Sequence, residues 1–255
     1  MMTASQMEDP KAPIGAFQLP CGYIDPATNE VFTDVEVREL TGVEEDIMAS
    51  RQVPSDRKLS MLLAGCTQRI GTITDRAKIN RIIDDLMIGD RVFLLFAIRR
   101  VTLGDEMPLR QTCPACRVSS LYVIDLSTLT IKQMPDSRKR VHDVTLPSGQ
   151  TARFRVSVGH DEQTSAKLAR QKDTDGNSRA IMMRLELLGD EPPTLDAVKH
   201  MSFRDRAYLR EQFDAVEGGV DTGLDFECPA CKHEWKEELS LGASSFFSLS
   251  EAQKH

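Results

Sequence analysis

Two stretches of the chain, residues 31–38 and 152–158, alternate between apolar and polar side chains. A period of two predicts strands that bury one face. A Leu-Pro-x-Gly segment precedes each stretch, beginning at Leu19 and at Leu146, and the first copy adds a turn signal, Asp25-Pro-Ala-Thr-Asn. The pattern therefore predicts one strand pair near the start of each half of the chain.

Helical patterns follow the first strand pair. Thr41-x-x-Glu44 is a capping-box sequence that predicts the start of a short helix. Further helices are expected at residues 54–69, 74–83 and 91–100, with Asp90 as the cap of the last. Because residues 92–98 are apolar nearly all round, we expect this last helix to lie in the core and to end at Gly104.

The second half continues in the same way. Helices are expected at residues 161–171 and 179–188, and a short one is expected after its cap, Thr194. Ser202-x-x-Asp205 predicts the start of a final helix that ends near Gly218. Each half is thus a strand pair followed by several helices.

Shared motifs indicate that the two halves are related. An Asp-Arg pair begins at Asp90 and again at Asp205, and Cys-Pro-Ala-Cys begins at Cys113 and again at Cys228; 205 − 90 and 228 − 113 both equal 115. We therefore expect an internal duplication, although two unrelated segments that each end in such a motif could look alike. The expected fold class is α+β, with repeats at 17–130 and 140–243 and tails at 1–16 and 244–255.

Composition narrows the function classes. The chain has 255 residues, of which 40% are hydrophobic and 28% charged, and a net charge of −7. An acidic protein gains no counterion release on a phosphate backbone, so nucleic acid is not an expected partner. Residues 92–98, the most apolar run, are far fewer than the ~20 that span a bilayer. Without a secretory signal at the start, we expect a protein made in a reducing cytoplasm.

The two Cys-Pro-Ala-Cys motifs predict a metal site. Two CxxC turns supply four thiolates, the commonest ligand set of structural zinc. Expected strands at residues 106–112, 117–126, 224–227 and 233–241 would make each turn the knuckle of a hairpin, as in a zinc ribbon. We predict one zinc ion, structural and not catalytic because four thiolates fill its shell. Its ligands would be Cys113, Cys116, Cys228 and Cys231.

Other interpretations of these cysteines stay open. Knuckles usually place glycine after the second cysteine, where a positive φ is wanted, but Arg117 and Lys232 stand there. A redox CxxC, local disulfides or knuckles without metal are alternatives, and His233 could replace a lost cysteine. Cys21 and Cys66 have no local partner and are expected to be small buried residues.

No catalytic set of residues is found in the sequence. The five histidines show no metal-protease spacing, and the phosphate-cradling and nucleophile-elbow motifs are absent. Asp173, Asp175 and Asn177 fit a calcium loop poorly and favour a plain turn. We therefore expect a protein that is not an enzyme and has no small-molecule substrate. Its terminal segments carry aromatic side chains that could bind a partner, namely Phe17, Phe246 and Phe247.

Several motifs together resemble a known family. They are Phe17-Gln-Leu-Pro20, residues 37–46, Gly89-Asp90-Arg91 leading into residues 94–99, the Cys113–Cys116 knuckle and residues 123–126. The chain resembles the T-even-type phage baseplate hub subunit and hub-assembly proteins, well over the first half and through the repeat over the second. The resemblance implies a non-enzymatic role in the virion tail or in its assembly in the host cytoplasm, with other baseplate proteins as partners. An assembly chaperone absent from the virion and a zinc-ribbon nucleic-acid adaptor remain alternatives.

Overall fold

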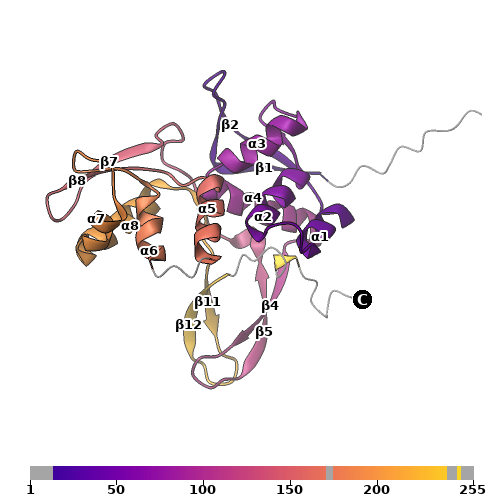
Figure 1. Cartoon of the computed structure of the whole chain (residues 1–255). Helices are drawn as coiled ribbons and strands as arrows, with labels where there is room; N and C mark the ends of the chain where they lie inside the picture. The colour runs from indigo at the N-terminus through magenta and orange to yellow at the C-terminus, as the bar shows by residue number, and fades with distance from the viewer. Residues whose placement is uncertain (1–13, 171–174, 240–245, 248–255) are drawn as a thin grey trace, which may run out of the picture.

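A computed structural model describes residues 14–170, 175–239 and 246–247. Most of the predicted tails at 1–16 and 244–255 lies outside these residues, as do Asp173 and the end of the last predicted strand. The described part is a mixed α/β structure with eight α-helices and several small antiparallel sheets. In Figure 1 two bodies lie side by side, and a pair of hairpins extends from between them.

The first body is built from two strands, two helices, a third strand and two more helices, and it is followed by a hairpin. These elements are β1 (Ile14–Ile24), β2 (Val31–Arg38), α1 (Gly42–Ala49), α2 (Ser55–Cys66), β3 (Thr67–Ile70), α3 (Arg76–Asp85), α4 (Ile88–Leu103), β4 (Glu106–Thr112) and β5 (Ser119–Asp125). β1, β2 and β3 form one three-stranded sheet in that order.

The second body has the same order of elements. They are β7 (Val141–Thr145), β8 (Thr151–Arg155), α5 (Gly159–Arg170), α6 (Gly176–Met182), β9 (Leu185–Leu188), α7 (Leu195–His200), α8 (Phe203–Val216), β11 (Gly223–Glu227) and β12 (Glu234–Glu238). β7, β8 and β9 again form a three-stranded sheet in sequence order. A 3₁₀ turn (Leu126–Thr128) and two short paired strands, β6 (Ile131–Lys132) and β10 (Gly219–Val220), connect the parts.

Two segments that the sequence predicts as the ends of helices are strands. α2 ends at Cys66 and residues 67–70 form β3, while α6 ends at Met182 and residues 185–188 form β9. Each strand pairs with the central strand of its sheet, for example Val35 with Ile70. Pairing with a distant strand overrides the local helical pattern here. Each strand ends at a glycine with positive φ, Gly71 or Gly189, whose N–H donates to the central strand.

Helix α4 lies at the centre of the first body, as its apolar sequence predicts. Phe93 to Arg99 are all buried. The largest core cluster gathers α4, α2, α3 and the first sheet, and a second cluster fills the body around Phe154, Leu209 and Phe213. Leu224 and Phe226 of β11 belong to the first cluster although they lie at the far end of the sequence. The second hairpin therefore packs on the core of the first body.

Asp90 is a buried residue inside α4, not the cap that the sequence predicts. The helix begins two residues earlier, and Oδ1 of Asp90 accepts hydrogen bonds from the backbone N–H groups of Cys21 (2.7 Å) and Gly22 (3.4 Å). Asp205 does the same in α8, where it accepts from the N–H of Ser148 (3.0 Å). Each aspartate thus fixes a Leu-Pro-x-Gly segment onto a helix.

The two aspartates differ at their second oxygen. Oδ2 of Asp205 accepts a hydrogen bond from the hydroxyl of Ser202 at 2.8 Å. Three residues before Asp90, where Ser202 stands relative to Asp205, the chain has Met87, which cannot donate such a bond. Oδ2 of Asp90 is therefore buried without a partner within the described residues. Burial raises the pKa of Asp90 to about 6, against the hydrogen bonds of Cys21 and Gly22. For Asp205, burial raises the pKa but the bonds from Ser202 and Ser148 outweigh it, and the pKa is lowered.

This difference predicts a pH effect on stability. The pKa of Asp90 in the folded protein is above its unfolded value, so protonation favours the folded state and this contribution to stability grows as pH falls from about 7 towards 4. Between pH 7.5 and 5.5 the gain should be about 1 kcal/mol, and Asp90→Asn should remove it. Urea unfolding of the wild type and of Asp90→Asn at both pH values measures how much of the gain in unfolding free energy depends on Asp90. Asp205→Asn should leave the gain in place, and an equal gain in Asp90→Asn would contradict the assignment.

Polar contacts join the two bodies near their centre. Nη1 of the buried Arg91 donates to the carbonyl of Ile83 (2.7 Å), and Nη2 lies 2.9 Å from Glu162 of α5. The side-chain amide of Gln163, also in α5, donates to Ser60 (3.1 Å) and Asp84 (2.8 Å). Helix α5 of the second body is therefore held on α2, α3 and α4 of the first.

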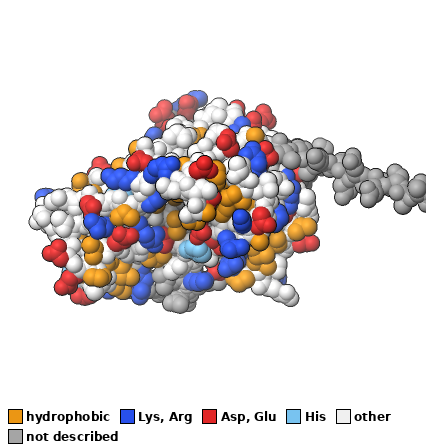
Figure 2. Space-filling model, turned by 90° about the horizontal axis from the view of Figure 1, so that it is seen from above, with side chains coloured by type: hydrophobic (Ala, Val, Ile, Leu, Met, Phe, Trp, Pro, Cys, Tyr) orange, Lys and Arg blue, Asp and Glu red, His pale blue; other side chains and the backbone are white. Residues whose placement is uncertain are grey.

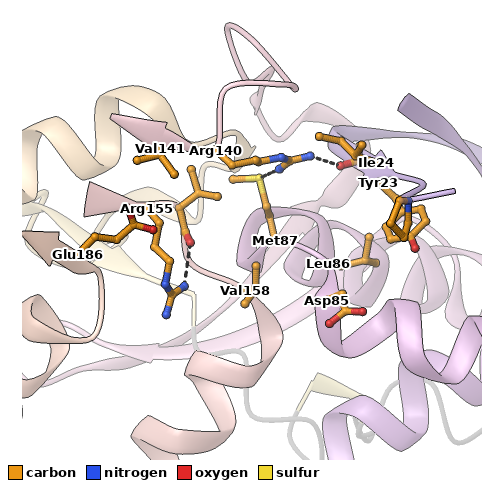
Figure 3. A pocket seen from close by; sticks show the side chains of 13 residues that line it. Tyr23, Ile24, Asp85, Leu86, Met87, Arg140, Val141, Arg155, Val158 and Glu186 are labelled. Carbon is orange, nitrogen blue, oxygen red and sulfur yellow. Dashed lines mark hydrogen bonds between the residues drawn. The ribbon is translucent and has the colours of Figure 1, made fainter. Parts of the chain in front are cut away.

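A cavity of about 540 Å³ opens where the two bodies meet, and Figure 3 shows the side chains that line it. Its wall is largely apolar, with Tyr23 and Met87 on one side and Val141 on the other. Arg140 reaches across from the second body and donates to the carbonyl of Gly22 at 2.7 Å. Arg155 is paired with Asp161 at 2.6 Å. Both cations in the wall are thus engaged within the chain.

The surface of the molecule is mixed in character. On the face seen in Figure 2, acidic, basic and apolar side chains are interspersed. None of the helices in the described ranges combines the length and apolar character needed to cross a bilayer.

Candidate metal centre

The four cysteines of the two Cys-Pro-Ala-Cys motifs meet at the tips of the two hairpins. Their sulfur atoms all lie within 4.8 Å of one another. Sγ of Cys113 is 3.7 Å from Sγ of Cys231, and Sγ of Cys116 is 3.6 Å from Sγ of Cys228. The tertiary structure therefore brings together all four predicted ligands, which come from motifs more than a hundred residues apart.

Both knuckles have the same backbone hydrogen bonds. The N–H of Cys113 donates to the carbonyl of Val118 and that of Cys228 to His233, each at 2.9 Å. The N–H of Arg117 donates back to Cys113 (3.0 Å), and that of Lys232 donates back to Cys228 (2.9 Å). This closed turn points both sulfurs of a pair to one side, so each hairpin presents a two-thiol clamp.

The residue after each second cysteine has a left-handed backbone. φ is 64° at Arg117 and 61° at Lys232, so the knuckles use the conformation that the sequence pattern predicts but without glycine. A left-handed backbone costs a residue with a Cβ roughly 1–2 kcal/mol. Both turns therefore carry a small strain that other interactions must offset.

Relieving this strain should stabilise the protein. We expect Arg117→Gly to raise the free energy of unfolding by a few tenths to about 1 kcal/mol, because glycine adopts positive φ freely but loses more entropy on folding. The matched control is Ala115→Gly in the same knuckle, which has no positive φ and should lower stability by about 0.5–1 kcal/mol. Urea unfolding of the metal-loaded protein measures both. If Arg117→Gly and Ala115→Gly changed the free energy of unfolding equally, residue 117 would not be strained.

Aromatic side chains hold the two hairpins together below the knuckles. The ring of Tyr122 on β5 packs edge-on against Phe226 (5.0 Å between centroids) and Trp235 (6.2 Å) of the second hairpin. The hydroxyl of Tyr122 donates to the carbonyl of Glu227 at 3.1 Å. These contacts were not predicted from the sequence, although the only tryptophan of the chain, four residues after Cys231, offered a signal.

The environment of the sulfur atoms favours the thiolate form at Cys228 and the thiol form at Cys231. Hydrogen bonds from the backbone N–H groups of Cys231 and Ala230 lower the pKa of Cys228 to about 7. The backbone bond from His233 acts to lower the pKa of Cys231, but the neighbouring thiols of Cys116 and Cys228 outweigh it and the pKa rises to about 12. Four thiolates this close repel one another, and a divalent cation among them would remove that repulsion.

The donor set fits a tetrahedral metal ion. With Zn–S bonds of about 2.3 Å, the sulfurs of a tetrahedral site are about 3.8 Å apart, close to the 3.6–3.7 Å seen across the two knuckles. A disulfide needs about 2.05 Å, and all six cysteines are free thiols. The knuckles are turns between strands, so no helix N-terminus activates a thiol for redox chemistry. The ring of His233 stacks on Trp235 and is not part of the cluster.

The remaining cysteines are core residues, as the sequence predicts. Cys21 and Cys66 are fully buried. Burial raises the pKa of both thiols, to about 12 for Cys66. Neither lies in the sulfur cluster.

The three aromatic residues predicted to bind a partner have different environments. Phe246 is only 1% exposed and packs edge-on against Phe96 of α4, so this side chain lies inside the chain's own core. Phe247 is partly buried beside it, and Phe17 packs on Phe93 while remaining partly exposed. A partner role for Phe246 would require its release from the core. For Phe17 and Phe247 it stays a prediction.

Comparison with known proteins gives one finding. A family model described as T4 bacteriophage base plate protein matches residues 32–248, which include the second body, the first body apart from β1 and the first residue of β2, and all four clustered cysteines. Neither the curated proteins nor the solved structures gave a match.

Proposed function

The chain belongs to the T4 bacteriophage base plate protein family, and from this we propose that it serves in the hub region of a phage tail baseplate, as a structural component or as a protein that assembles it. The observation that carries the proposal is the match over residues 32–248, most of the chain. The work of such a protein is to hold other tail proteins in place, which requires a defined shape and surfaces for partners.

We further propose that the four-cysteine cluster binds one structural zinc ion. The sulfur spacing and the all-thiolate donor set support zinc, which prefers this arrangement in closed structural sites. Bound there, the ion would contribute to folding free energy and would leave no open position for a substrate. Elemental analysis of protein purified without chelator should find one zinc per chain.

An internal duplication accounts for the equivalent elements. We propose that residues 17–130 and 140–243 descend from one ancestral unit of two strands, two helices, a strand, two helices and a knuckle hairpin. The common element order, the two aspartates on Leu-Pro-x-Gly segments and the identical knuckle hydrogen bonds support this. In this proposal the zinc joins one knuckle from each copy.

The tail role is tested by where the protein resides. Quantitative mass spectrometry of purified particles of the phage that encodes the chain should find it in a fixed ratio to the other baseplate proteins. Presence in infected cells but absence from purified particles would shift the role to an assembly chaperone. Absence from both tails and tail-assembly intermediates would overturn the proposal.

A further inference from the structure

The outer face of the first hairpin is apolar in its middle, and at its base, far from the knuckle, it carries Glu106 opposite Asp125. In the β4–β5 register Leu121 lies opposite Arg110 and Val123 lies opposite Pro108, so these four side chains share one face. Leu121 is 52% exposed and Val123 is 59% exposed. The other face carries Tyr122 and Ile124, which pack toward the core. The hairpin therefore already buries its inner face and still presents apolar side chains outward.

In the second hairpin, β11–β12, the positions equivalent to this outer face carry charged side chains. At the offset of 115 residues, Lys236 takes the place of Leu121, Glu238 that of Val123, and Asp225 that of Arg110. Asp225 and Lys236 lie opposite each other and form an ion pair at 3.1 Å. Charged side chains on the exposed strands of a hairpin also discourage unwanted pairing. Nothing in the hairpin fold itself thus requires apolar residues on the outer face.

The charge on the apolar face indicates the chemistry of what covers it. Arg110 lies opposite Leu121, nearer the knuckle than Val123, and forms no ion pair within the described ranges of the chain. A surface that buries Leu121 and Val123 must also desolvate this guanidinium, which is costly unless an anion pairs with it. Two copies of the chain that met around a two-fold axis through the apolar middle of this face would instead place two Arg110 side chains near each other.

From these observations we propose that the outer face of the β4–β5 hairpin is a docking surface for another protein of the tail. That partner presents an apolar surface with a carboxylate positioned to pair with Arg110. The inference rests on the proposed baseplate function and names one of its contact surfaces. The hairpin projects beyond both bodies in Figure 1, and Leu121 and Val123 are more than half exposed, so a partner can reach this face without rearrangement of the described fold.

The test transfers the charges of the second hairpin to the first. The triple variant Arg110→Asp, Leu121→Lys, Val123→Glu copies residues that the equivalent strands already tolerate, so zinc content and Tm should match those of the wild type. Cells that supply the variant are infected with phage lacking its own copy, and plaques and particle-bound protein are counted. We expect the triple variant to give at least about 100-fold fewer plaques than the wild-type chain, the effect of removing an interface hot spot.

Controls separate the possible outcomes. The matched variant Asp225→Lys, Lys236→Asp reverses the ion pair of the second hairpin and should complement like the wild type. A triple variant with normal zinc content and Tm that also complements overturns the inference, whereas failure of the wild-type chain to complement overturns the baseplate function. If the wild type sediments as a dimer and the triple variant as a monomer, the occupant is a second copy and the proposal is wrong. Should the triple variant not fold, Leu121→Lys alone is measured in the same way.

Discussion

Replacing Cys228 by serine is expected to release the metal and to lower the stability of the folded protein strongly. Cys228 is fully buried and its sulfur lies 3.6 Å from that of Cys116 on the other hairpin. With free zinc a thousandfold above its dissociation constant, a bound ion stabilises the folded state by about 4 kcal/mol. We expect the substitution to remove that amount, together with the measured zinc.

The loss should be centred on the hairpins. The two bodies are also joined through Arg91, Glu162 and Gln163, independently of the sulfur cluster. Circular dichroism should therefore retain the helical signal at room temperature, while limited proteolysis should cut within residues 106–125 and 223–238. Calorimetry and elemental analysis measure the effect.

Cys66→Ala is the matched control, because Cys66 is equally buried but lies outside the cluster. It should cost some packing energy and leave the zinc content unchanged. A Cys228→Ser protein that keeps one zinc per chain, or a wild type with two or none, would contradict the shared site.

Gly89→Ala should also lower the stability of the folded protein strongly. A Cβ at residue 89 would lie 2.0 Å from the carbonyl oxygen of Gly218 and 3.1 Å from Cα of Gly219. These are backbone atoms, so no side chain can turn aside, and α4 would have to move away from β10. We expect a loss of about 2–4 kcal/mol in the free energy of unfolding, measured by urea titration at fixed zinc.

Gly42→Ala provides the comparison. Gly42 is the first residue of α1, and a Cβ there would meet no atom within 4 Å. Alanine should therefore be neutral or stabilising by up to about 1 kcal/mol, since it forms helix more readily than glycine. If Gly89→Ala were as mild as Gly42→Ala, the close approach of α4 and β10 would be wrong.

The sequence predicted well those features that depend on neighbouring residues. The capping glutamate Glu44, the caps Thr194 and Ser202 and the end of α4 at Gly104 all lie where the pattern placed them. The positive φ at Arg117 and Lys232 follows from the geometry of a CxxC knuckle even though the residue type argues against it. In each case the interacting groups lie within about one helical turn or one reverse turn.

The errors occurred where distant strands decide the local structure. Residues 67–70 follow α2 without an intervening glycine or proline, so their sequence continues a helical pattern, yet pairing with β2 makes them a strand. Residues 185–188 behave in the same way beside β8. The prediction of Asp90 as a cap was also wrong, since its hydrogen-bond donors at Cys21 and Gly22 lie almost seventy residues away.

The sequence by itself determined the two knuckles, most helices and the family to which the chain belongs, because spacing and short-range hydrogen bonds encode them. Only the tertiary structure decided that four sulfurs from motifs far apart meet within 4.8 Å. It also decided that Leu224 and Phe226 of the second hairpin pack on the core of the first body, and that Leu121 and Val123 remain exposed. Which apolar surfaces cover one another depends on contacts between segments far apart in the chain, and no local pattern specifies these contacts.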